Sequence, residues 1–325
     1  MIEAFLFILG LALLIAGAEF LVRGASSLAG SMGISPLVIG LTVVAFGTSF
    51  PEFAVNMTAS LQGTSDISFG NIIGSNIANI GLILGCAALI RPLSVRGIVI
   101  LREIPMMLLA TGAVLIMGFD EILTRTPSRF DRADGLLLLL LFCVFLYYTV
   151  TGVFKGISRT SLLEETDQLV REKSSQGALT SMFITAAGLV MLLIGARLVV
   201  NASVEIARMA QIPEAVIALV LVAIGTSLPE LATSILASAK GQYDIAMGNV
   251  VGSNIFNLLF ILGTSSSIRP CPVPSGGYLD LAAMAVFSLI LLPFSMTGKH
   301  TLSRFEGGVL LGMYLLYILY RVIPG

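Results

Sequence analysis

Long apolar segments separated by short polar ones run through the whole chain. A membrane-spanning helix needs about 20 predominantly apolar residues, and a lipid-exposed backbone must satisfy its own hydrogen bonds, which favours helices. Ten segments meet this length: 4–22, 36–61, 67–90, 98–118, 133–153, 178–200, 213–238, 245–267, 278–297 and 305–323. The pattern therefore predicts an all-α polytopic membrane protein with ten transmembrane helices.

One long polar segment, residues 154–177, interrupts this pattern and carries charges of both signs. It is predicted to be a solvated linker, with a regulatory element as the alternative. It divides the chain into a first five-helix half, residues 1–153, and a second five-helix half, residues 178–325. The first apolar segment lacks a basic leading region and a small-residue cleavage site, so it is expected to be a retained span rather than a signal peptide.

The two halves contain a duplicated segment. Residues 39–85 align with residues 217–263 at a constant offset of 178 without a gap, and 25 of the 47 positions are identical. Because five spans is an odd number, the second half starts on the opposite side of the membrane and the repeats are predicted to be inverted. In transporters built this way, the substrate site lies near the bilayer midplane, where broken helices of the two halves meet.

Composition and charge narrow the possible functions. Hydrophobic residues make up 56% of the chain and charged residues 11%, with a net charge of −1. A lipid bilayer is therefore an expected partner and nucleic acid is not. The three cysteines are far apart and are interpreted as packing residues. No nucleophile–base pair, histidine cluster or nucleotide-binding loop is present, so an enzyme is not expected and no cofactor is predicted.

The basic residues predict the orientation. Eleven of the 18 Lys and Arg residues fall on the side of the membrane that holds the linker 154–177. Since cytoplasmic loops are enriched in basic residues, the linker is predicted to be cytoplasmic and both termini to lie outside. The absence of a large regulatory domain favours the plasma membrane of a prokaryote. The sequence predicts no particular oligomeric state.

The segment "GTSFPE", residues 47–52, is the least lipid-like part of the second span, and "GTSLPE" repeats it at residues 225–230. Gly47 and Pro51 weaken a helix, and Pro51 removes one backbone hydrogen bond. Thr48 and Glu52 are four residues apart and share a helix face, with Ser49 one position round. An ionisable side chain inside a membrane is usually functional, so Glu52 and its counterpart Glu230 are expected to form a site.

The next span carries "GNIIGSNIAN", residues 70–79, and its counterpart carries "GNVVGSNIFN", residues 248–257. Ser75 and Asn79 share a helix face, and Gly74 is a possible helix break. The following residues have secondary expectations. Asn71, Asn76, Asn249 and Asn254 are expected to make interhelical hydrogen bonds, Asp66 and Asp244 to cap helices, and Glu19 and Arg197 to have structural roles.

Hydroxyl, carbonyl and carboxylate oxygens are ligands for hard cations such as sodium or calcium. Two glutamates supply charge for one Ca²⁺ or two Na⁺ at a shared site. Competition between one divalent ion and several monovalent ions for the same oxygens would couple their movements, because an empty pair of carboxylates resists crossing the membrane while a loaded site crosses readily. The residues expected to contribute by spacing are Thr48, Thr226, Ser49, Ser227, Ser75, Ser253, Asn79 and Asn257.

These paired motifs resemble the repeats of the cation/calcium antiporter superfamily, in particular the prokaryotic sodium/calcium exchangers. The resemblance implies a ten-helix exchanger fold, alternating access with sodium entry driving calcium out, and a mobile pair formed by spans 1 and 6. By motif position it implies a ligand set of Glu52, Glu230, Thr48, Thr226, Ser49, Ser227, Ser75, Ser253, Asn79 and Asn257, with backbone carbonyls near Ala45 and Ala223. Sodium and calcium ions are then transported substrates.

Asn257 departs from the pattern of some relatives, which carry Asp at this position. The change removes a possible third acidic ligand and argues against dependence on potassium. A proton/calcium exchanger is the first alternative, a potassium-dependent sodium/calcium exchanger another, and a passive cation channel a less favoured one.

Overall fold

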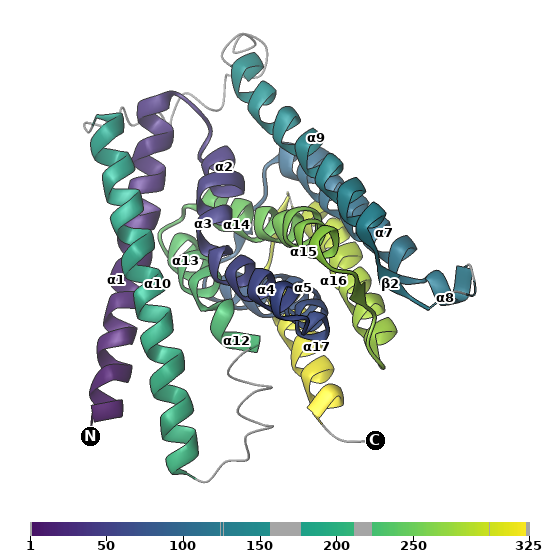
Figure 1. The fold of residues 1–325 in the computed structure, drawn as a ribbon. Coiled ribbons are helices and arrows are strands. Elements are labelled where there is room, and N and C mark those ends of the chain that lie inside the picture. The colour runs from purple at the N-terminus through teal and green to yellow at the C-terminus, as the bar shows by residue number, and fades with distance from the viewer. Residues whose placement is uncertain are drawn as a thin grey trace.

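The computed structural model describes residues 2–123, 125, 127–156, 177–210, 223–298 and 300–322, and these are almost entirely helical (Figure 1). The predicted linker therefore lies largely outside the described residues. The first half contains α1 (Ile2–Met32), α2 (Pro36–Ile39), η1 (Gly40–Val44), α3 (Ala45–Thr48), α4 (Phe50–Gln62), α5 (Ser65–Ala78), η2 (Asn79–Leu84), α6 (Gly85–Ile90), β1 (Leu93–Ser94), η3 (Val99–Glu103), α7 (Ile104–Gly118), α8 (Asp120–Leu123), β2 (Arg129–Phe130) and α9 (Arg132–Gly156). Elements named η are π-helical turns.

The second half is also mainly helical. It contains α10 (Ala178–Met209), α12 (Ala223–Thr226), α13 (Leu228–Ala239), α14 (Tyr243–Ile255), η5 (Phe256–Ile261), α15 (Leu262–Ile268), β3 (Cys271–Pro272), α16 (Gly277–Met296), β4 (Thr301–Leu302) and α17 (Arg304–Val322). Strand β1 pairs with β4, and β2 pairs with β3. Both small sheets therefore join one half of the chain to the other.

Seven helical segments of the described chain are long and apolar enough to cross a membrane, and the bent pair formed by residues 36–48 and 50–62 would make eight. The predicted span 305–323 is also helical, as α17. The predicted span 213–238 lies partly outside the described residues. The polytopic α-helical architecture is thus confirmed, and the count of ten spans stays a prediction.

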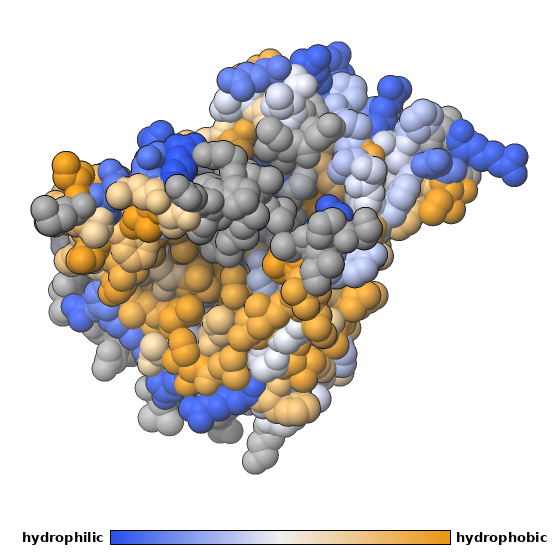
Figure 2. All heavy atoms as spheres, turned by 90° about the horizontal axis from the view of Figure 1, so that it is seen from below, coloured by the Kyte–Doolittle hydropathy of each residue, from blue (hydrophilic) through white to orange (hydrophobic). Residues whose placement is uncertain are grey.

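Each half of the chain starts at one end of the molecule and finishes at the other. In Figure 1 the start of α1 and the end of α17 lie at the bottom, whereas the end of α9 and the start of α10 lie at the top. An odd number of crossings in the first half would produce this arrangement. Figure 2 shows the molecule from below, where apolar residues cover much of the visible face and hydrophilic residues gather near its margins.

Helices α1 and α10 pack closely side by side along their length (Figure 1). A Cβ atom on Gly17 would lie 2.4 Å from the backbone nitrogen of Leu192, and one on Gly188 would lie 2.4 Å from that of Leu21. Glycine is needed here because any side chain would meet the partner's backbone. Small residues allow such contacts between membrane helices, where van der Waals packing drives association.

Several local features differ from the sequence prediction. Helix α5 continues through Gly74, so no break occurs there. Asp244 lies in the first turn of α14 and pairs with Arg96 at 2.6 Å, while Gln242 is the N-cap residue. Asp66 also lies inside its helix, which follows the N-cap Thr64. Both capping predictions were therefore wrong. Each helix starts one residue before the predicted cap, at Ser65 and at Tyr243, and Asp244 makes a tertiary ion pair instead.

The α1–α10 contact generates a stability prediction. Gly188→Leu should destabilise the protein by about 1–3 kcal/mol, since overpacking forces backbone shifts. Thermal unfolding of the purified protein in detergent should show this as a lowered midpoint. Gly112→Leu is the matched control, because a Cβ atom on Gly112 has no neighbour within 4 Å. Equal midpoints for the two variants would contradict the tight contact.

Candidate cation site

Two broken helices carry the two motifs. Helix α3 ends at Thr48, Ser49 has φ −81° and ψ 7°, and α4 starts at Phe50 with Pro51 in its first turn. The two segments are bent by 46°. Proline fits the first turn of a helix because its missing N–H would be unpaired there in any case. The predicted break is confirmed, and it places Glu52 in the first turn of α4.

The second motif has the same backbone arrangement. Helix α12 ends at Thr226, Ser227 has φ −90° and ψ 5°, and α13 starts at Leu228 with Glu230 in its first turn. The N-terminal end of a helix carries partial positive charge, which favours a carboxylate. Both glutamates therefore lie where their own helices stabilise negative charge, and both side chains are 1% exposed.

The serines at the breaks contact the glutamate of the opposite motif. The Ser49 hydroxyl donates to Oε1 of Glu230 at 2.9 Å, and the Ser227 hydroxyl donates to Oε1 of Glu52 at 3.3 Å. A hydrogen bond also joins Ser227 to the Ser75 hydroxyl at 3.3 Å. The two motifs are therefore in direct contact, and each supplies a polar group to the carboxylate of the other.

The threonines at the breaks show the same exchange of partners. Thr48 donates to Oδ1 of Asn249 at 3.0 Å, and Thr226 donates to Oδ1 of Asn71 at 3.3 Å. The amide nitrogen of Asn249 in turn donates to the Ser234 hydroxyl at 2.9 Å. These contacts agree with the expectation that the two asparagines make interhelical hydrogen bonds.

The asparagines that end the second motif lie at π-helical turns. Asn79 starts η2, and Asn257 lies within η5. Such turns are rare and are often found at functional sites. The amide nitrogen of Asn79 donates to Oδ1 of Asn254 at 2.9 Å. The side-chain oxygen of Asn79 has no hydrogen-bond partner.

A set of buried oxygen atoms lacks hydrogen-bond partners. Leaving a buried polar atom unpaired usually costs about 1–3 kcal/mol and more for a charged group. All of these atoms are oxygens, so together they suit a hard cation better than a soft metal. No group of three or more His, Cys, Asp or Glu side chains that could hold a metal occurs among the described residues. The unpaired atoms of the predicted ligand set are Glu52 Oε2, Glu230 Oε2, Asn79 Oδ1, Asn257 Oδ1 and Ser253 Oγ.

Ala45 and Ala223 differ in what the structure describes. The Ala45 carbonyl accepts hydrogen bonds from the backbone N–H of Ser49 at 3.0 Å and from the Thr48 hydroxyl at 3.4 Å. Ala223 starts α12, and its side chain is not among those described. Two carbonyl hydrogen bonds use the two lone pairs of the Ala45 oxygen, so a cation there would have to replace one of them.

Two features lie apart from Glu52 and Glu230. Glu19 of α1 forms ion pairs with Lys240, which follows α13, and with Arg23. This agrees with its expected structural role.

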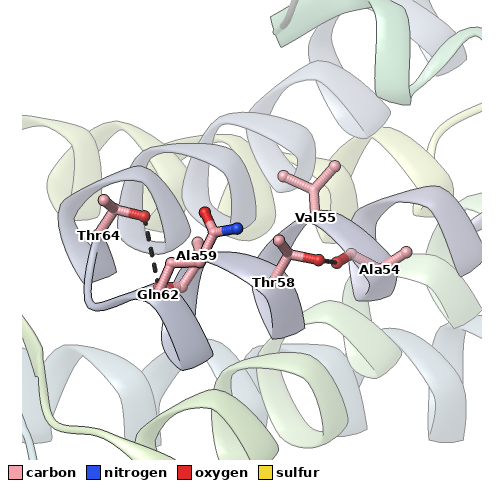
Figure 3. Close-up of a pocket in the computed structure, with 6 residues that line it drawn as sticks. All are labelled: Ala54, Val55, Thr58, Ala59, Gln62 and Thr64. Atoms are coloured by element: carbon pink, nitrogen blue, oxygen red, sulfur yellow. Dashed lines mark hydrogen bonds between the residues drawn. The ribbon is translucent and has the colours of Figure 1, made fainter.

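A surface hollow of about 350 Å³ runs along α4, and we call it the α4 hollow (Figure 3). Its lining residues are Ala54, Val55, Thr58, Ala59, Gln62 and Thr64.

Comparison with known proteins connects this geometry to a family. The family model described as "Sodium/calcium exchanger protein" matches residues 2–151 and 180–323. The putative antiporter CaxA of Alkalimonas amylolytica is 38% identical over 98% of both chains. The sodium/calcium exchanger MaX1 of Methanosarcina acetivorans is 34% identical over 96% of both chains.

A solved structure has the same overall fold. The sodium-calcium exchanger NCX_Mj, soaked with 10 mM Na⁺ and zero Ca²⁺, matches with a TM-score of 0.83 and 33% sequence identity, over 98% of each chain. Sequence and fold agree over nearly the whole length. The chain is a member of the sodium/calcium exchanger family, a family of membrane transporters.

Proposed function

We propose that this protein exchanges Na⁺ for Ca²⁺ across the membrane at one site built on Glu52 and Glu230. The observation that carries the proposal is the unpaired buried oxygen on each glutamate, next to a serine from the opposite motif. Two carboxylates balance one Ca²⁺ or two Na⁺. The relatives named as sodium/calcium exchangers support this choice of ions.

The proposed ligands are the residues that carry oxygen around the two breaks. The carboxylates would supply the charge, and the hydroxyls and amide oxygens would complete the coordination shell with neutral ligands. In this proposal Ser49 and Ser227 each turn from the opposite glutamate to the ion when it binds. The full set is Glu52, Glu230, Thr48, Thr226, Ser49, Ser227, Ser75, Ser253, Asn79 and Asn257, with the carbonyls of Ala45 and Ala223.

Alternating access is the proposed mechanism, and an asymmetry between the halves supports it. Helix α1 packs against α13, and Lys240 is paired with Glu19 across this contact. The equivalent face of α4 bears the α4 hollow instead, and the described contacts of α10 are mainly with α1, α3, α12 and α13. A shift of the α1–α10 pair would cover α4 and uncover α13, which would exchange the two states.

The proposed topology has both termini outside, the segment 154–177 in the cytoplasm, and two inverted halves. The location of both chain ends at one end of the molecule supports it (Figure 1). With the linker inside, a prokaryotic plasma membrane is the proposed location. Calcium would leave the cell as sodium enters.

Neutralising either glutamate should abolish exchange. Glu52→Gln and Glu230→Gln each keep the side-chain shape but remove one of the two negative charges that balance Ca²⁺. We expect calcium uptake by vesicles to fall to the level of protein-free vesicles, with a normal elution profile in gel filtration. Glu205→Gln is the control, because Glu205 lies on an exposed face and pairs with Arg208. Normal uptake by either site variant would contradict the proposal.

The coupling ion can be tested with the unmodified protein. Vesicles loaded with sodium should take up calcium when diluted into sodium-free buffer, and added potassium should not change the rate, because Asn257 adds no third charge. A proton gradient that replaces the sodium gradient should not drive uptake. Uptake driven by protons would favour proton/calcium exchange, and uptake that ignores every gradient would favour a channel.

A further inference from the structure

A line of polar residues runs along α4 away from the site. Glu52, Asn56 and Ser60 are four residues apart, and this spacing places them on one helix face. All three are 2% exposed or less. Thr64 continues the spacing just beyond the helix end, and it lines the α4 hollow (Figure 3). The line therefore leads from the surface to a site glutamate.

Each of the three buried residues presents an oxygen without a hydrogen-bond partner. These atoms are Glu52 Oε2, Asn56 Oδ1 and Ser60 Oγ. The amide nitrogen of Asn56 donates to the backbone carbonyl of Glu52 at 2.6 Å, so its amide oxygen points away from that carbonyl. Three successive turns thus each carry an unpaired oxygen, although nearly all buried polar atoms in proteins find a partner.

The equivalent line on α13 has partners. Residues 230, 234 and 238 correspond to 52, 56 and 60 by the offset of 178. The Ser234 hydroxyl accepts from the amide of Asn249 at 2.9 Å, and the Ser238 hydroxyl donates to the Ala87 carbonyl at 2.9 Å. Gln242, the counterpart of Thr64, accepts from Ser26 of α1 at 3.5 Å. The α13 residues equivalent to Asn56 and Ser60 are therefore hydrogen-bonded, whereas Asn56 and Ser60 each keep an unpaired oxygen.

The helix that packs against α4 is also richer in hydroxyls than its counterpart. Helix α4 contacts α15, and α13 contacts α6. By the same offset, Ser265 and Ser266 of α15 replace Ala87 and Ala88 of α6, and all four residues are buried. The Ser266 hydroxyl donates to the Leu262 carbonyl at 2.8 Å, so these serines make the contact around α4 more polar than its counterpart.

We propose that Asn56 and Ser60 form a subsite for a monovalent alkali cation on α4, one and two helical turns beyond Glu52. The inference rests on the proposed function, since it takes Glu52 as an ion ligand. Both subsite oxygens are neutral, and the nearest carboxylate in the line is one helical turn away. A monovalent hard cation matches the single negative charge of that carboxylate, whereas Ca²⁺ would leave one positive charge unbalanced.

The main test compares Ser60→Ala with Ser238→Ala, its counterpart in the second half. Ser60→Ala removes a cation ligand that has no hydrogen bond, so it should raise the sodium concentration for half-maximal exchange about three- to tenfold without lowering the unfolding midpoint. Ser238→Ala removes a hydrogen-bonded hydroxyl, so it should lower the midpoint and leave the sodium dependence unchanged. Unchanged sodium dependence in Ser60→Ala would overturn the subsite.

A second measurement does not depend on transport. Crystals of the full chain soaked with Tl⁺, a monovalent probe with strong anomalous scattering, should show a peak between Asn56 and Ser60 that Asn56→Leu removes. A peak only beside Glu52 and Glu230 would overturn the subsite. Wild-type vesicles that fail to exchange sodium for calcium would instead contradict the proposed function, and the thallium map would still decide the subsite.

Discussion

Two carboxylates are buried at one place inside a membrane protein, and their charge has to be balanced. Glu52 and Glu230 are almost completely buried, and each keeps one oxygen unpaired. Taking a charge out of water costs several kcal/mol even after the protein relaxes. The surrounding structure reduces this cost through two helix N-terminal ends and two serine hydroxyls. In the proposed function, a bound cation would supply the rest of the balance.

The same constraint explains why the motifs have their composition. Pro51 and Pro229 each lie in the first turn of the helix that carries the glutamate, and the N-terminal end of a helix favours a carboxylate. Ser49 and Ser227 are the single non-helical residues between the two segments of their broken helices. From there each hydroxyl reaches the glutamate of the other half. A single motif would lack these partners.

Much of this could be predicted from the sequence because it depends on local chemistry. Hydrophobic length predicted the helical segments, and the Gly–Thr–Ser–x–Pro–Glu pattern predicted the break and the buried carboxylate. Several features that depend on tertiary packing were not predicted. The serines bond to the opposite glutamate, the π-helical turns place Asn79 and Asn257, and Asp244 pairs with Arg96 rather than capping its helix. Hydrophobic periodicity does not distinguish a π-helical turn, which has one extra residue, from an α-helical turn. Capping preferences describe local sequence and cannot identify a partner from another part of the chain.

The central claim is that calcium and sodium compete for the oxygens of one two-glutamate site. Equilibrium binding of radioactive calcium to the purified protein in detergent, measured over a series of sodium concentrations, tests it most directly. Sodium should displace calcium completely, with a Hill coefficient above one because at least two Na⁺ replace one Ca²⁺, and Glu52→Gln should bind no calcium. Calcium binding that persists at saturating sodium would contradict the account.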